Sequence, residues 1–283
     1  MLEISDALAD FGNLRPGGMT TPLPQFPAVW TDEHLEVRVE SAKDAQAFGR
    51  APRVVASPAP PWDKCLHCRG TGYGVEGRDG YDYAVPCRCR DLRRWADGIT
   101  SARFPADMLG ATLDNWRPSE FWPAASQLRA YAATWEPGAA GRLYCGPNGI
   151  GKSWLMATVA RELIARPLPR RIVVRWVEWS TLLDELRDGF SGKRPESEII
   201  GPLLNCDVLC VDELGKGQRT EWADAALERI VGRRLETGWT VLATTNVDAA
   251  GLPSALGGRV YSRLVGRCQV RTMAGPHRRV VAE

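Results

Sequence analysis

The chain has 283 residues, of which 44% are hydrophobic and 25% charged, which is enough to bury one large core and a smaller one beside it. Its 36 basic and 34 acidic side chains leave a net charge of +2, which indicates neither a strongly basic nucleic-acid-binding protein nor an acidic disordered one. No run reaches the roughly 18 apolar residues of a membrane span, and acids lie where a signal peptide would be basic. We therefore expect a cytoplasmic protein without membrane contact, whose eight cysteines are thiols or metal ligands.

Residues 1–61 are rich in proline, with eight of the 20 prolines of the chain. Proline resists regular structure, so this composition predicts a partly flexible N-terminal arm in which only residues 2–11 and 35–48 could order. The same segment could instead bind a partner and fold on contact. Both interpretations stay open at this point.

The next segment, residues 62–103, contains two close pairs of cysteines. Cys65 and Cys68 enclose two residues, Cys87 and Cys89 enclose one, and five glycines lie between the pairs. Four thiolates in this arrangement suit tetrahedral Zn²⁺. So short a segment can form only a small hydrophobic core and needs a cross-link such as a bound metal ion. Because four cysteines leave no open coordination position, we predict a structural zinc site. The remaining cysteines follow strand patterns and are expected in the core: Cys145, Cys206, Cys210 and Cys268.

Residues 104–283 alternate between apolar strand patterns and helical patterns. Strands rich in Val, Ile and Leu that alternate with helices predict an α/β domain with a parallel sheet covered on both faces. Five strands are predicted, at residues 142–145, 171–179, 207–212, 239–245 and 269–273, and helices at residues 152–165, 181–190 and 221–236.

A phosphate-binding loop follows the first of these strands. The segment Gly146–Ser153 reads G-P-N-G-I-G-K-S and fits G-x-x-x-x-G-K-[ST] at every fixed position. It opens a predicted helix, whose N-terminus adds its dipole to the backbone amides that surround the phosphates. We predict that Lys152 contacts the β- and γ-phosphates of ATP and that Ser153 binds Mg²⁺. The predicted nucleotide-binding residues are Gly146, Pro147, Asn148, Gly149, Ile150, Gly151, Lys152, Ser153 and Asp212.

Polar residues end the third and fourth apolar strands of the pattern. Asp212 and Glu213 follow Val208–Val211, and buried strands rarely end in two acids without a cation to balance them. We expect Asp212 to bind Mg²⁺ with Ser153, and Glu213 to polarise the attacking water. Asn246 ends the following strand and is expected beside the γ-phosphate and that water. With Lys152, Glu213 and Asn246 form the predicted catalytic set.

The order of loop, acidic pair and polar strand end resembles the AAA+ division of P-loop ATPases, where these elements are Walker A, Walker B and sensor 1. By this resemblance Gly257–Leu264 looks like the arginine-finger helix. Arg263, with Arg259 as its companion, would then reach the nucleotide of a neighbouring subunit, which implies self-association. Alternatively, both arginines line a solvated helix face.

The cysteine segment, joined to the lead-in Ile99–Trp116, is similar to that of DnaC/DnaI-like replicative helicase loaders, in the IstB-like ATP-binding branch, over about residues 62–280. The resemblance implies a Mg²⁺-dependent ATPase without a C-terminal lid domain. Such a protein engages a hexameric DNA helicase in replication initiation, and its ATP state switches contacts with the helicase and single-stranded DNA.

Six arginines within residues 259–283 could follow DNA phosphates or form the subunit interface. Two other functions stay open: an IstB-like transposition ATPase that pairs with a transposase, and a zinc-dependent adaptor with incidental ATP hydrolysis.

Overall fold

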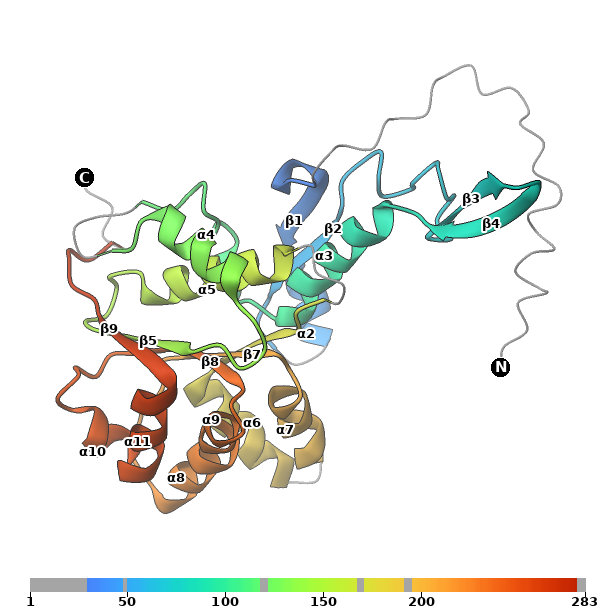
Figure 1. Ribbon diagram of the computed structural model, residues 1–283. Coiled ribbons are helices and arrows are strands. Elements are labelled where there is room, and N and C mark those ends of the chain that lie inside the picture. The colour runs from blue at the N-terminus through green and yellow to red at the C-terminus, as the bar shows by residue number, and fades with distance from the viewer. Residues whose placement is uncertain (1–29, 48–49, 118–121, 167–170, 191–194, 279–283) are drawn as a thin grey trace.

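A five-stranded parallel sheet lies at the centre of the molecule (Figure 1). The computed structural model describes residues 30–47, 50–117, 122–166, 171–190 and 195–278. Strands β7 (Val208–Asp212) and β8 (Thr240–Thr245) are buried at every position, as a parallel sheet covered on both faces requires. The predicted α/β architecture is therefore confirmed. In spatial order the strands are β6 (Val174–Glu178), β7 (Val208–Asp212), β8 (Thr240–Thr245), β5 (Gly141–Cys145) and β9 (Cys268–Thr272).

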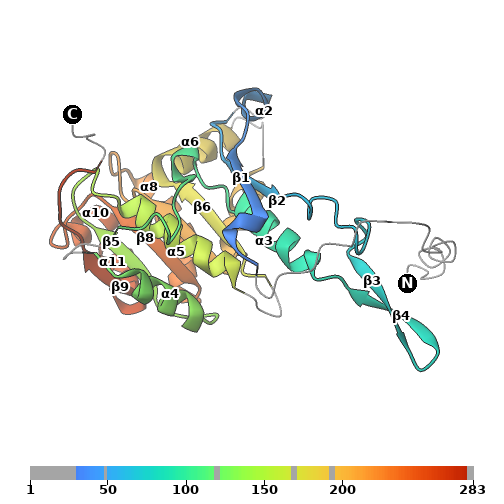
Figure 2. The same cartoon turned by 90° about the horizontal axis from the view of Figure 1, so that it is seen from above.

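Helices cover both faces of this sheet and enclose two hydrophobic cores (Figures 1 and 2). One core contains Tyr144 of β5 and Cys210 of β7 and packs under α3 (Cys89–Ala102), α4 (Ala125–Thr134) and α5 (Lys152–Ala165). The neighbouring strand residues, such as Leu143 and Leu209, point into the other core because side chains alternate across a strand. The second core is covered by α6 (Trp179–Phe190), α7 (Glu196–Leu204), α8 (Glu221–Leu227), α9 (Arg233–Glu236), α10 (Leu252–Leu256) and α11 (Gly258–Arg267).

The bounds of several elements differ from those that the sequence predicts. The helix at residues 152–165 is confirmed at both ends. The strand predicted over residues 171–179 covers only 174–178, because Trp179 already begins α6 and packs its indole into the second core. The helix predicted over 221–236 is interrupted by a π-helical turn at Glu228–Gly232. Helices α4, α7 and α10 were not predicted, and α7 contains Pro202, a residue that argues against a helix in sequence.

The described part of the N-terminal segment packs against α3. Strands β1 (Leu35–Val39) and β2 (Val54–Pro58) pair antiparallel, with α2 (Ala42–Ala47) between them. The backbone N–H of Ala56 donates to the Thr100 hydroxyl of α3 at 2.9 Å, and Val54 is fully buried. Residues 35–39 and 42–47 of one patch expected to order are thus regular structure, whereas β2 lies outside both predicted patches and is ordered by its pairing with β1. The other patch, residues 2–11, lies outside the described residues.

The cysteine segment forms a projecting hairpin whose base joins α3 (Figure 2). Strands β3 (Tyr73–Arg78) and β4 (Tyr81–Pro86) pair antiparallel, and Cys89 is the first residue of α3. Helix α3 continues into the first core, where Gly98 lies so close to α5 that a Cβ would come within 2.4 Å of Ile164 Cγ2. The glycine therefore permits the close approach of the two helices. Among the described residues, no helix is long and apolar enough to cross a membrane.

Candidate nucleotide-binding site

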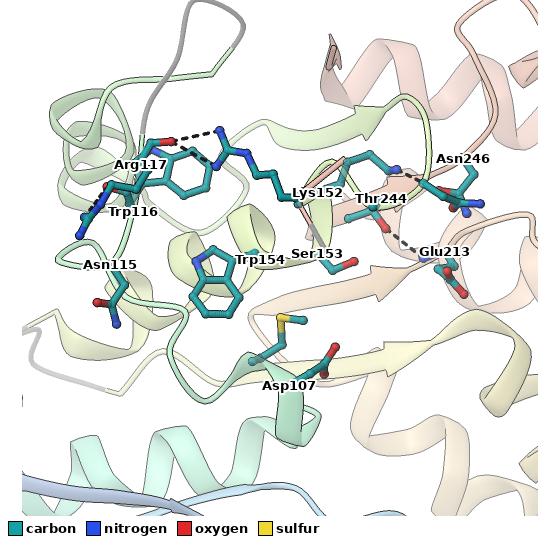
Figure 3. A pocket seen from close by; sticks show the side chains of 15 residues that line it. Asp107, Asn115, Trp116, Arg117, Lys152, Ser153, Trp154, Glu213, Thr244 and Asn246 are labelled. Carbon is teal, nitrogen blue, oxygen red and sulfur yellow. Dashed lines mark hydrogen bonds between the residues drawn. The ribbon is translucent and has the colours of Figure 1, made fainter. Parts of the chain in front are cut away.

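A cavity of about 390 Å³ opens at the carboxyl ends of the central strands, beside the N-terminus of α5 (Figure 3). Ligands of open parallel sheets bind at this edge, where loops and helix N-termini converge. The lining residues are Asp107, Met108, Asn115, Trp116, Arg117, Asn148, Gly149, Gly151, Lys152, Ser153, Trp154, Glu213, Thr244, Asn246 and Arg278.

The loop between β5 and α5 has the backbone of a phosphate cradle. Gly146, Gly149 and Gly151 have φ of 145°, 73° and 101°, values that L side chains rarely adopt. A Cβ at Gly146 would also lie 2.3 Å from the carbonyl oxygen of Met273, so the position has no room for a side chain. Glycines at these positions let successive amides turn toward one point, as anion binding requires.

Lys152 is the buried cation of this loop, with only 5% of its surface exposed. Its Nζ donates to the carbonyl oxygens of Gly146 at 2.8 Å and Pro147 at 2.6 Å, and to Asn246 Oδ1 at 2.9 Å (Figure 3). The structure thus joins the loop to the polar end of β8, two features that the sequence separates by 94 residues.

The two residues predicted to bind Mg²⁺ also meet. Ser153 Oγ donates to Asp212 Oδ1 at 2.8 Å, and the Thr244 hydroxyl donates to the same oxygen. Burial raises the pKa of Asp212, and these two hydrogen bonds oppose the shift. A hydroxyl and a carboxylate side by side are the oxygen ligands that Mg²⁺ prefers, so the donor set fits that ion.

Glu213 lies at the rim of the same cavity in a left-handed conformation, with φ of 53°. Its backbone N–H donates to Thr244 Oγ1 at 3.0 Å, which places Thr244 between the two acidic residues (Figure 3). Sequence reasoning missed the role of Thr244, although it precedes Asn246 by two residues in the T-T-N strand end. It also missed Lys216, whose ammonium is hydrogen-bonded to the Glu213 carboxylate.

Arg263 is not among the residues that line the cavity. It lies on α11, where its guanidinium is bonded to Glu228 and lies 3.4 Å from Glu236 of the same chain. The side chain retains 26% exposure, so another subunit could still reach it. Within this chain, the predicted finger is separate from the phosphate loop.

An aromatic clamp that sequence reasoning did not identify flanks the loop. The clamp consists of Trp116, Trp122 and Arg278: the indole rings are 5.2 Å apart, and the guanidinium lies 4.4 Å from the Trp122 ring. The backbone N–H of Arg278 donates to the carbonyl of Gly149 at 2.8 Å. This segment follows β9 and returns to the loop, so it closes one side of the cavity. The sequence signals are Trp116, at the end of the lead-in, and Arg278, among the arginines of residues 259–283.

The four cysteines of the hairpin base converge as predicted. Their sulfur atoms all lie within 4.8 Å of one another, and the four residues are buried. The pairs Cys65–Cys87 and Cys68–Cys89 have Sγ–Sγ distances of 3.8 and 3.4 Å. Burial raises the pKa of Cys68, but backbone hydrogen bonds near Gly72 and Gly70 and contacts with the neighbouring thiols bring it down to about 7. Four closely spaced sulfur atoms fit a tetrahedral metal ion of the zinc type. The other cysteines are buried in the two cores, as expected.

Known proteins are similar in sequence to about half of this chain. No family model matches. The replicative helicase loader DnaC of Escherichia coli is 26% identical over 141 residues, which are 50% of this chain and 56% of that protein. DnaC of Buchnera aphidicola subsp. Baizongia pistaciae is also 26% identical, over 48% of this chain and 54% of the relative. This chain thus spans about half the length of the curated relatives that it matches.

Solved structures share the fold. The crystal structure of the DnaC helicase loader superposes with a TM-score of 0.53 at 20% identity and covers 59% of this chain and 99% of that chain. The crystal structure of DnaI gives a TM-score of 0.53 at 22% identity, over 60% of this chain and 95% of the other. In sequence and in fold, the chain is therefore DnaC-like, which confirms the resemblance inferred from its motifs.

Proposed function

We propose that this protein is a Mg²⁺-dependent ATPase that acts in the cytoplasm as a loader of a replicative DNA helicase. One observation supports the ATPase assignment. The contacts Lys152–Asn246 and Ser153–Asp212 bring the phosphate loop, the acidic pair at the end of β7 and the polar end of β8 together at one cavity. The loader assignment rests on the similarity to DnaC.

The residues of the cavity divide the work of phosphoryl transfer. Residues 146–153 hold the triphosphate of ATP, with the Lys152 ammonium at the β- and γ-phosphates. Ser153 and Asp212 would hold Mg²⁺, which would neutralise charge on the phosphate oxygens. Glu213 accepts the proton of the attacking water, whose oxygen bonds to the γ-phosphorus as the bond to ADP breaks. Asn246, fixed by Lys152, orients that water.

Arg263 completes the site of a neighbouring subunit in this proposal. Its guanidinium would stabilise the charge that spreads over the transferred phosphoryl group, and it must first leave Glu228 and Glu236. Assembly therefore exchanges an ion pair within one chain for a contact between chains. This exchange makes turnover depend on self-association.

The other parts of the chain bind partners or stabilise the structure in this proposal. Residues 62–103 form a zinc-binding module, with Zn²⁺ held by the four cysteines, and residues 104–283 form the ATPase domain. Residues 1–61, the segment that could fold on contact with a partner, would contact the hexameric helicase. The ATP state switches contacts with the helicase and with single-stranded DNA, for which the arginines of residues 259–283 supply positive charge.

The test is co-purification of the protein with the replicative helicase of its host in ATP and Mg²⁺. Loading is then measured as helicase unwinding of DNA whose single strand is coated with binding protein. We expect a complex, and unwinding that depends on the loader. A truncation that begins at Trp30, and so keeps the β1–β2 pair packed against α3, serves as the control for the arm. Recovery of a transposase, or failure to bind helicase, would contradict the loader assignment and leave the ATPase assignment to be judged by turnover.

A further inference from the structure

Lys216 lies between two carboxylates, one of which, Glu213, lines the nucleotide cavity. Its ammonium is hydrogen-bonded to Glu213, and its Nζ lies 3.8 Å from Glu178 Oε1. Glu178 ends β6, and its register partner on the neighbouring strand is Asp212. The strand ends therefore gather three acids, and Lys216 is the cation that contacts two of them.

Hydrogen bonds fix the backbone around Lys216, whereas its side chain is accessible to solvent. The N–H of Lys216 donates to the Glu213 carbonyl at 3.0 Å, and the N–H of Leu214 donates to the Thr244 carbonyl at 2.8 Å. The Thr245 hydroxyl donates to the Leu214 carbonyl at 2.9 Å. The Lys216 side chain is 50% exposed, so its four-carbon stem can turn without moving the loop.

The position of the ammonium matters because of what Glu213 must do. A general base needs a free, correctly directed carboxylate oxygen within hydrogen-bond reach of the water. An ammonium hydrogen-bonded to that carboxylate occupies one of its oxygens and so competes with the water for it. In the observed arrangement, Lys216 thus opposes the proton transfer that hydrolysis requires.

We propose that Lys216 is a positioning residue that holds Glu213 inactive, and that transfer of its ammonium to Glu178 releases Glu213 for hydrolysis. Glu178 is suited to receive it because Ser180 Oγ donates to its Oε1 at 2.7 Å and Thr181 Oγ1 to its Oε2 at 3.2 Å, which fix the carboxylate. The inference rests on the proposed ATPase activity and adds a control of its basal rate.

The experiment compares steady-state ATP hydrolysis by the 283-residue protein and four variants. Lys216→Met frees Glu213 and should raise kcat about twofold to fivefold, the range that an exposed ion pair supports, without a change in the KM for ATP. Lys216→Arg keeps the cation and should retain the low rate. Glu178→Gln removes the second acceptor and should lower kcat. The double variant Glu178→Gln/Lys216→Met should match Lys216→Met, because without the ammonium the second acceptor has no role.

Glu213→Gln in each background is the control that assigns the measured turnover to this site. An unchanged or lower kcat in Lys216→Met would overturn the proposal, as would a fast Lys216→Arg variant or a double variant as slow as Glu178→Gln. Binding of a fluorescent ATP analogue shows that each variant folds with a formed cavity. A failure of the proposed function can be told apart from a failure of this inference. In that case the wild-type protein neither binds the helicase nor hydrolyses ATP in its presence, whatever the kcat of Lys216→Met.

Discussion

Lys152 Nζ and Asn246 Oδ1 lie 2.9 Å apart, although 94 residues separate them in the chain. The bond connects the phosphate loop at the end of β5 with the end of β8, its neighbour in the sheet. Two substitutions at this one contact can therefore distinguish the two roles. A change of Lys152 removes the charge that binds phosphate, and a change of Asn246 removes the amide that orients the attacking water.

Lys152→Ala should weaken ATP binding about 100-fold or more, since a charge-assisted contact to phosphate is worth about 3 kcal/mol. Asn246→Ala should bind ATP nearly as well as the wild type but lower kcat about 100-fold, since its amide acts on the transition state. Titration with a fluorescent ATP analogue and phosphate-release kinetics measure the two effects. Tight binding by Lys152→Ala would refute the assignment of the loop.

Arg263→Ala should spare ATP binding and lower kcat about 10³-fold, as loss of an arginine finger does. The decisive measurement mixes Arg263→Ala with Glu213→Gln protein, each inactive alone. If the finger acts between subunits, mixed assemblies contain sites with both an intact Glu213 and an intact Arg263, and turnover returns. No recovery in mixtures that are shown to co-assemble would instead assign Arg263 to its ion pair with Glu228.

Asp212→Asn should stabilise the protein at neutral pH while abolishing Mg²⁺-dependent hydrolysis. Burial raises the pKa of Asp212 from 3.8, so the folded state favours the protonated acid, and its contribution to stability is lost as pH rises through the raised pKa. The Tm difference between variant and wild type should therefore vanish below pH 3.8 and grow above it. Mg²⁺ with ATP should raise the Tm of the wild type by more than that of the variant, which keeps residues 146–153 but lacks one Mg²⁺ ligand. A wild type more stable than the variant at pH 7 without Mg²⁺ would contradict this account.

Protein purified without chelator should contain one equivalent of zinc by elemental analysis, because four buried sulfur atoms converge at the hairpin base. Cys89→Ser should lose that zinc and unfold the β3–β4 hairpin, with a smaller effect on the sheet domain. Cys145→Ser, which alters a core cysteine outside the cluster, is the matched control and should retain the metal. Metal-free wild-type protein with an intact hairpin would refute the zinc site.

The sequence alone determined the features that are contiguous along the chain. The spacing of Gly146, Gly151 and Lys152 specifies a phosphate loop, because neighbouring amides and one lysine perform the task within eight residues. The alternation of apolar strands and helices likewise gives a parallel sheet, and the sheet brings the ends of β5, β7 and β8 to one edge. That is why the sequence predicts Asp212 and Asn246 at the same edge of the sheet.

Only the tertiary structure decided which distant side chains meet. The register that sets Glu178 beside Asp212, the return of Arg278 to Gly149 and the pairing of Arg263 with Glu228 depend on how whole elements pack. Arg234 is the clearest case: a surface helix pattern would expose it, yet it is 1% exposed and donates to five carbonyl oxygens around the start of β7. Those carbonyls belong to helix and strand ends that lose their backbone partners when the chain turns. No local pattern in the sequence marks which arginine will satisfy them.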